Sequence, residues 1–168
     1  MPAFRDATLD DAAALSELGK RSFTETFGHL YSPDNLAAFL VTHEQANWRE
    51  QLASSIYSVR VIEGEKALIG YAKVGPPTLP LTPRGTPLEL RQFYILKPWQ
   101  GEGLAPVLMA WVLAEARRRG ADELYLSVFT DNHRARRFYT RYGFVEVGPY
   151  QFMVGDHADE DIVMRLAL

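Results

Sequence analysis

Two glycines, Gly101 and Gly103, lie in the segment KPWQGEG, directly before an amphipathic helical pattern. Glycine has no Cβ, so backbone N–H groups at such positions can turn outward toward a ligand. The N-terminus of the helix that follows adds a partial positive charge. This combination suits a pyrophosphate. A tight turn that needs glycine only for its backbone angles would have the same sequence, and both interpretations stay open at this point.

Two common phosphate-binding motifs do not fit the segment. The dinucleotide motif G-x-G-x-x-G requires a third glycine, but Pro106 stands there, and the segment lies in the middle of the chain. The P-loop requires Gly-Lys-Ser or Gly-Lys-Thr, and neither follows the glycines. We therefore expect a phosphate site of another kind.

The residues that are missing limit the chemistry further. The chain contains no cysteine, which excludes disulfides, thiolate-bound zinc and a cysteinyl intermediate. Its four histidines show no metal-ligand spacing, so no metal is expected. Acidic residues gather in GDHADED, between Asp156 and Asp161, where they would attract a cation or form an ordinary solvated turn.

The composition describes a folded domain without a basic excess. The chain has 168 residues, 47% of them hydrophobic, and a formal net charge of -3. Nucleic-acid binding relies on clustered Lys and Arg, so no nucleic-acid partner is expected. No apolar run approaches the roughly 18 residues of a membrane-spanning helix, and the N-terminus lacks a basic and apolar leader pattern. We expect a single domain over residues 1–168, cytoplasmic and without a membrane partner.

The hydrophobic pattern predicts the elements that must position the glycines. Helices are predicted over residues 9–23, after Ser32-Pro33, around Trp48 and Leu52, from about Gly103 to Gly120, and over 132–142. Strands are predicted over residues 57–64, 66–75, 88–96, 122–130, 144–148 and 161–168, the first two as an antiparallel hairpin. Five prolines within residues 76–87 predict a loop. This order indicates an α/β or α+β domain with a mixed sheet.

The helix after the glycines is expected to bury one stripe of side chains. The predicted stripe consists of Leu104, Val107, Leu108, Trp111 and Ala114. Arginines in the last turn suit the negative end of the helix dipole, and Gly120 supplies a left-handed cap.

At this point the sequence resembles a known family. The segment QGEGLA, residues 100–105, is similar to the Q/R-x-x-G-x-G/A signature of the GCN5-related N-acetyltransferases (GNAT). Residues 132–144 resemble the family's N-x-x-A-x-x-x-Y-x-x-x-G-F helix, and residues 22–40 are similar to spermidine/spermine-type bacterial members. The resemblance implies the GNAT fold, a mixed, mostly antiparallel central sheet flanked by helices.

The resemblance also implies acetyl-CoA as co-substrate and assigns residues to it. Backbone amides would hold the pyrophosphate across Gln100, Gly101, Glu102, Gly103, Leu104 and Ala105. The backbone of Phe93, Tyr94 and Ile95 would pair with the pantetheine arm like an added strand. Asn132 would bond the coenzyme arm, and it also suits the N-cap of its helix. Arg136 or Arg137 would reach the ribose 3′-phosphate, unless both are ordinary surface cations.

Two catalytic roles follow from the same resemblance. Tyr139 matches the family's general acid, which protonates the departing thiolate of coenzyme A. Glu89 aligns by spacing with the carboxylate that deprotonates the attacking amine, but it would equally suit a carboxylate that only binds a substrate cation. An aliphatic ammonium has a pKa of about 10.4, so some group must take its proton before the nitrogen can attack.

The expected function is an N-acetyltransferase that moves an acetyl group from acetyl-CoA to a primary amine of a polyamine-like small molecule, by direct attack in a ternary complex. A protein or peptide acceptor, a non-catalytic acyl-CoA sensor and a homodimeric interaction module remain alternatives. Acceptor specificity is expected to reside in the N-terminal helices and in the proline-rich loop.

Overall fold

The computed structural model describes all residues from Met1 to Leu168. Seven strands form one sheet in the order β1-β2-β3-β4-β5-β7-β6. In chain order the strands are β1 (Ala3–Asp6), β2 (Ser58–Glu63), β3 (Leu68–Gly75), β4 (Pro87–Ile95), β5 (Glu123–Phe129), β6 (Val145–Val154) and β7 (His157–Ala167). Only β4 and β5 run parallel, and every other neighbouring pair is antiparallel. The predicted mixed, mostly antiparallel sheet is confirmed.

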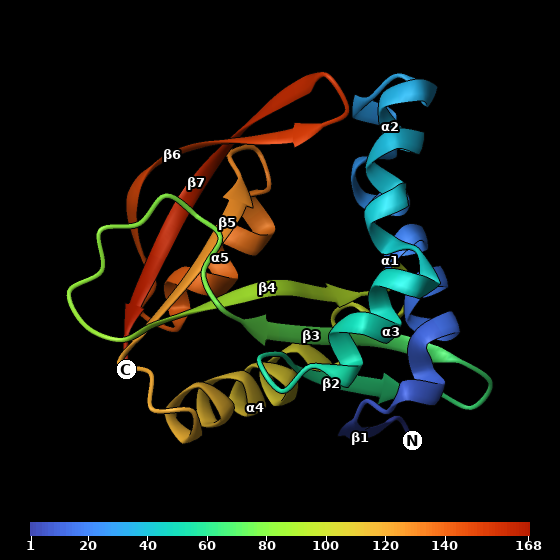
Figure 1. Cartoon of the computed structure of the whole chain (residues 1–168), viewed down its shortest axis with the longest axis horizontal. Coiled ribbons are helices and arrows are strands. Elements are labelled where there is room, and N and C mark those ends of the chain that lie inside the picture. The colour runs from blue at the N-terminus through green and yellow to red at the C-terminus, as the bar shows by residue number, and fades with distance from the viewer.

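Five α-helices cover the two faces of this sheet (Figure 1). They are α1 (Ala12–Phe27), α2 (Pro33–Leu40), α3 (Gln45–Ala53), α4 (Leu104–Arg118) and α5 (His133–Arg141). On one face α4 and α5 pack over β3, β4 and β5 around a core of 19 buried residues. On the other face α1 and α3 pack over β2 and β3 around a second core of nine. None of the helices is long and apolar enough to cross a membrane.

Three details differ from the sequence predictions. A short N-terminal strand, β1, pairs with β2 and was not predicted, because four residues give too little alternation to recognise. The last two strands are longer than predicted, since the acidic segment after Gly155 continues as β7. In α4 the predicted Val107 and Ala114 are exposed. Its buried face consists of Leu104, Leu108, Met109, Val112, Glu115 and Ala116.

The feature that creates space in the fold is the divergence of β4 and β5. These parallel strands pair over only three residues each, Pro87–Glu89 of β4 with 123–125 of β5. Beyond Glu89, β4 continues along β3 while β5 turns away with β7, so the two halves of the sheet open like a V (Figure 1). From Leu90 to Ile95, β4 has no strand partner on its β5 side.

A buried carboxylate fastens the closed end of this V. Glu123, the first residue of β5, is 2% exposed and accepts hydrogen bonds from Arg165 Nε and the Tyr125 hydroxyl, both at 2.5 Å. Its other oxygen accepts the backbone N–H groups of Arg84 (2.6 Å) and Gly85 at the end of the proline-rich loop. Burial alone would raise the pKa of Glu123, but these bonds together lower it to about 2. The carboxylate therefore holds β5, β7 and the loop together.

We predict that Glu123→Gln lowers the free energy of unfolding by about 3 kcal/mol, because it removes the buried carboxylate that pairs with the half-buried Arg165. Urea denaturation at neutral pH measures the loss. The matched control is Glu146→Gln, which removes an exposed carboxylate paired with Arg136 and should cost less than about 1 kcal/mol. Equal losses in the two variants would contradict the anchoring role.

Candidate active site

A single cavity of about 710 Å³ occupies the opening between β4 and β5. Its lining includes the consecutive runs Leu90–Ile95 of β4 and Leu126–Phe129 of β5. Successive side chains of a strand point to opposite faces, so the cavity contacts both faces of the sheet. It therefore runs through the sheet, from the N-terminus of α4 on one face to α1 and β7 on the other.

The loop before α4 forms one end of the cavity. Gly101 and Gly103 both have positive φ, +87° and +78°, and a Cβ at either position would meet no atom within 4 Å. The glycines are therefore required by the backbone conformation and not by crowding. The cavity is lined by Gln100, Gly101, Gly103 and Ala105. The Glu102 side chain is exposed, so only its backbone could contribute to the site, and Leu104 is buried in the core.

Gln100 joins three elements at this end. Its side-chain amide donates to the carbonyl of Ile95, the last residue of β4, at 2.8 Å, and accepts a hydrogen bond from Arg134 of α5 at 3.1 Å. Phe93, Tyr94 and Ile95 all line the cavity along the unpaired edge of β4. An extended ligand arm could therefore lie along this edge as an added strand would.

The helix α5 supplies one polar cap and two cations to the same end. The Asn132 side chain caps the helix by accepting from the Ala135 N–H at 3.3 Å, and it also lines the cavity. The cavity-lining arginines of α5 are Arg134 and Arg141, and neither was singled out from the sequence for this position. Arg134 lies four residues before Phe138 and Arg141 lies three residues after it, so all three share one helix face. This spacing could have identified the two arginines from the sequence.

The two arginines expected at the coenzyme phosphate lie elsewhere. Arg136 donates to the Thr130 carbonyl at 2.9 Å and is paired with Glu146. Arg137 is exposed, and neither residue lines the cavity. Arg134 and Arg141 are therefore better placed than Arg136 or Arg137 to meet a phosphate at this end.

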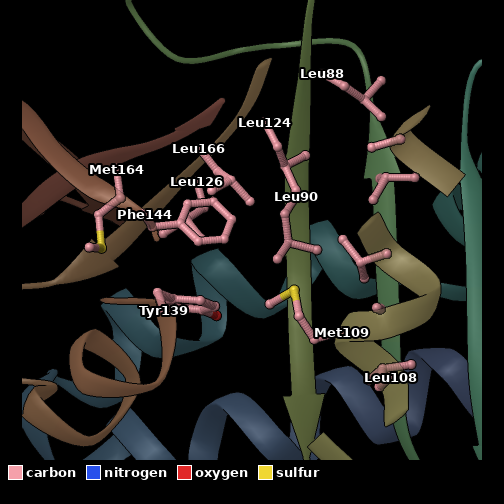
Figure 2. Close-up of a cluster of buried hydrophobic side chains, with 14 of the residues drawn as sticks. Leu88, Leu90, Leu108, Met109, Leu124, Leu126, Tyr139, Phe144, Met164 and Leu166 are labelled. Carbon is pink, nitrogen blue, oxygen red and sulfur yellow. The ribbon is translucent and has the colours of Figure 1, made fainter. Parts of the chain in front are cut away.

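Tyr139 of α5 is a buried residue that lines the cavity beside Phe93 of β4. Its ring packs against Phe138 and Phe144 at centroid distances of 5.5 and 5.7 Å, and it lines the cavity. Figure 2 shows the side chain reaching from α5 beneath Phe144, with its hydroxyl directed toward β4. Burial, and secondarily Tyr94, raises the pKa of the Tyr139 phenol, so it stays protonated at neutral pH. It is able to act as a proton donor.

The structure places Glu89 out of direct contact with an acceptor in this cavity. It lies at the closed end of the V and does not line the cavity. Its carboxylate accepts the backbone N–H groups of Thr78 (2.9 Å) and Leu79 (3.2 Å) and is paired with Arg91 at 3.0 Å. Glu89 thus secures the proline-rich loop. That loop contributes no residue to the cavity, contrary to the expectation that it shapes specificity.

The opposite end of the cavity is aromatic and acidic. Its walls come from α1, β5, β6 and β7, and the aromatic residues there are Phe23, Phe27, Tyr31, Phe129 and Phe152. Asp159 and Asp161, two residues apart on β7, are the only carboxylates that line the cavity. The Tyr31 hydroxyl donates to Asp159, and His157 Nε2 lies 3.1 Å from the other oxygen of that carboxylate. No group of His, Asp and Glu in the chain could hold a metal ion.

A glycine-lined helix N-terminus and an open strand edge on one cavity are features of an enzyme that binds a long, phosphate-bearing co-substrate. A sequence model of the acetyltransferase (GNAT) family matches residues 13–144. The chain belongs to this family, and it is an acetyl-CoA-dependent N-acetyltransferase by that membership. The family resemblance of the glycine segment and of α5 is thereby confirmed.

Individual relatives agree with this membership. The chain is 29% identical over 157 residues to an uncharacterized N-acetyltransferase of Mycobacterium tuberculosis, covering 93% of this chain and 97% of the relative. The fold is similar to that of the N-acetyltransferase PaiA of Thermoplasma acidophilum, solved in complex with coenzyme A, with a TM-score of 0.78, 16% identity and coverage of 100% and 99%. It is also similar to YncA of Salmonella typhimurium, solved with acetyl-CoA, with a TM-score of 0.70, 24% identity and coverage of 100% and 94%.

We predict that Gly103→Ala weakens coenzyme A binding about 10- to 100-fold, because a residue with a Cβ disfavours the left-handed conformation that aims the loop N–H groups at an anion. Isothermal titration with coenzyme A measures the change. Gly148→Ala is the matched control, since Gly148 has ordinary φ and open space around it. Equal affinity in both variants would contradict a phosphate-binding role for the loop.

Proposed function

We propose that this protein transfers the acetyl group of acetyl-CoA to a primary amine of a small, polyamine-like molecule, by direct attack within a ternary complex. One observation carries the proposal. A single cavity connects a loop suited to phosphate with a pair of carboxylates suited to an ammonium, and it passes Tyr139 on the way. Donor and acceptor could therefore enter from opposite faces and meet between β4 and β5.

Acetyl-CoA fits the end near α4. The glycine loop offers N–H groups to the pyrophosphate, the β4 edge offers its backbone to the pantetheine arm, and Arg134 and Arg141 offer charge to phosphate. The PaiA and YncA structures hold coenzyme A and acetyl-CoA respectively, which supports the same donor for this chain.

A small amine fits the other end. The tip of the β6–β7 hairpin is tied to the N-terminal helices, through Tyr31 to Asp159 and through the Asp156 N–H to the Asn35 side chain at 3.0 Å. These ties restrict the space for a polypeptide acceptor. Aromatic walls beside carboxylates suit an ammonium carried on an apolar chain, as in polyamines.

The reaction needs no covalent enzyme intermediate, and the chain has no cysteine to form one. The neutral amine nitrogen forms a bond to the acetyl carbonyl carbon, and the carbon–sulfur bond then breaks. The Tyr139 phenol, which lies near the unpaired β4 edge, gives its proton to the departing sulfur. Direct attack predicts intersecting initial-rate lines when both substrates are varied, and a ping-pong pattern would contradict it.

We predict that Tyr139→Phe lowers kcat by about 100-fold or more, because the thiolate leaves without a proton donor. Coenzyme A release from acetyl-CoA is measured over spermidine, spermine, amino acids and a lysine peptide. Tyr142→Phe is the matched control, since Tyr142 packs on the same helix but does not line the cavity.

Three outcomes separate the hypotheses. Turnover with polyamines and a selective loss in Tyr139→Phe supports the proposed acceptor class and the acid. Turnover with the lysine peptide alone would favour a protein acceptor. Binding of acetyl-CoA with no turnover of any amine would favour an acyl-CoA sensor.

A further inference from the structure

An ammonium acceptor must lose a proton before its nitrogen can attack, and the residue expected to take it, Glu89, lies off the cavity beneath the proline-rich loop. The cavity is lined by no histidine and no glutamate. The carboxylates that an acceptor in the cavity could contact directly are therefore those of Asp159 and Asp161.

The two aspartates are not equivalent. Asp159 is occupied on both oxygens, by the Tyr31 hydroxyl and by His157. Asp161 is 7% exposed, and its Oδ1 is fully buried without a hydrogen-bond partner. A buried carboxylate oxygen without a donor is costly in a folded protein, and on a residue that lines a cavity it points to a ligand that supplies the donor. A substrate ammonium would supply the donor.

From these contacts we propose that Asp161 is the general base of the reaction: it binds the acceptor ammonium and takes the proton that must leave before attack. This proposal rests on the proposed function. Of the two protons that nitrogen loses on becoming an amide, one replaces the proton that Tyr139 gives to the coenzyme A sulfur. The other passes to the Asp161 carboxylate and is then released to water. Asp159, which accepts the Tyr31 hydroxyl and contacts His157, lies two residues away on the same strand.

The surroundings of Asp161 support proton transfer. Burial, followed by the charge of Asp159, raises the pKa of Asp161 to about 7, with an opposing contribution from Ser127 of β5. A base with a pKa near the working pH is well matched to this role. The other titratable groups around it are Tyr31, Tyr94 of β4 and Tyr150, its register partner on β6.

Asp161 is also electrostatically linked to the proposed acid. The Asp161 charge contributes to the raised pKa of Tyr94, and Tyr94 in turn contributes to the raised pKa of Tyr139. The Tyr94 phenol, which also lines the cavity, is thus electrostatically coupled to both the proposed base and the proposed acid.

The test compares wild type with Asp161→Asn on two acceptors across about pH 5.5 to 9, a range that brackets a base titrating near neutrality. One acceptor is an aliphatic primary amine from the panel, which enters as a cation. The other is trifluoroethylamine, which is already uncharged at neutral pH and needs no base. The matched control is Glu160→Gln, which removes the neighbouring carboxylate on the exposed face of β7.

We predict that wild-type kcat/KM for the aliphatic amine rises with pH through a midpoint of about 7, because Asp161 must be ionised to accept the proton. In Asp161→Asn this rise disappears, and the rate with the aliphatic amine at neutral pH falls about 100-fold or more. The rate with trifluoroethylamine falls less than about tenfold. Glu160→Gln should behave as wild type. Asparagine keeps the shape and removes a like charge beside Asp159, so coenzyme A affinity and thermal unfolding should stay at wild-type values.

Equal losses for both acceptors, or a retained pH limb in Asp161→Asn, would overturn the proposal. If the variant failed to fold, the wild type alone would still decide, since the pH limb must be present with the aliphatic amine and absent with trifluoroethylamine. Absence of any amine turnover by the wild type would count against the proposed function. Amine turnover with unaltered Asp161→Asn kinetics would count against the base alone.

Discussion

The architecture depends on the separation of two parallel strands. The hydrogen bonds between β4 and β5 end at Glu89, so backbone groups along the rest of β4 are unpaired on that side and need other partners. One of these groups, the Ile95 carbonyl, accepts a hydrogen bond from the Gln100 side chain. The others are available to an extended ligand, so an edge that costs stability in the free protein becomes a binding surface.

Both sides of this opening are held by specific contacts. At the closed end, Glu123 and Glu89 use backbone N–H groups of the proline-rich loop to fix the point where the strands part. On the open side, aromatic rings of α5 contact Phe93 of β4, with Phe138 at 5.6 Å. Loop and helix thus define the opening from two directions. The loop acts on the cavity through the strands and not by lining it.

The charges along the cavity are separated by sign. Lys97, Arg134 and Arg141 line the end near the positively polarised N-terminus of α4, and Asp159 and Asp161 line the other. A polyanionic donor and a cationic acceptor would each be attracted to one end and repelled from the other. This separation of charge is not revealed by the formal net charge of -3 over the whole chain.

Local signals in the sequence predicted residues that line one end of the cavity, but they did not predict the lining of the other end. The glycine loop and the N-cap, acid and packing positions of α5 lie within short segments whose spacing carries the information. The acceptor end is assembled from α1, β6 and β7, far apart in the chain, so no spacing relates them. Asp161 looked like part of an acidic turn because the register of β7, which turns it inward, depends on long-range pairing. Glu89 lies on the strand expected from the sequence, but its carboxylate is held by the proline-rich loop and does not line the cavity.

One physical effect, removal from water, prepares both of the proposed proton-transfer groups. Burial raises the pKa of the Tyr139 phenol, which keeps its proton in place until a thiolate needs it. Burial also raises the pKa of Asp161, which makes its carboxylate a stronger base than an exposed aspartate. The same change therefore keeps the phenol in its protonated form at one point of the cavity and strengthens the carboxylate as a base at another. A cavity that runs between the two halves of a sheet supplies this dry environment to both groups without any metal ligand or reactive thiol.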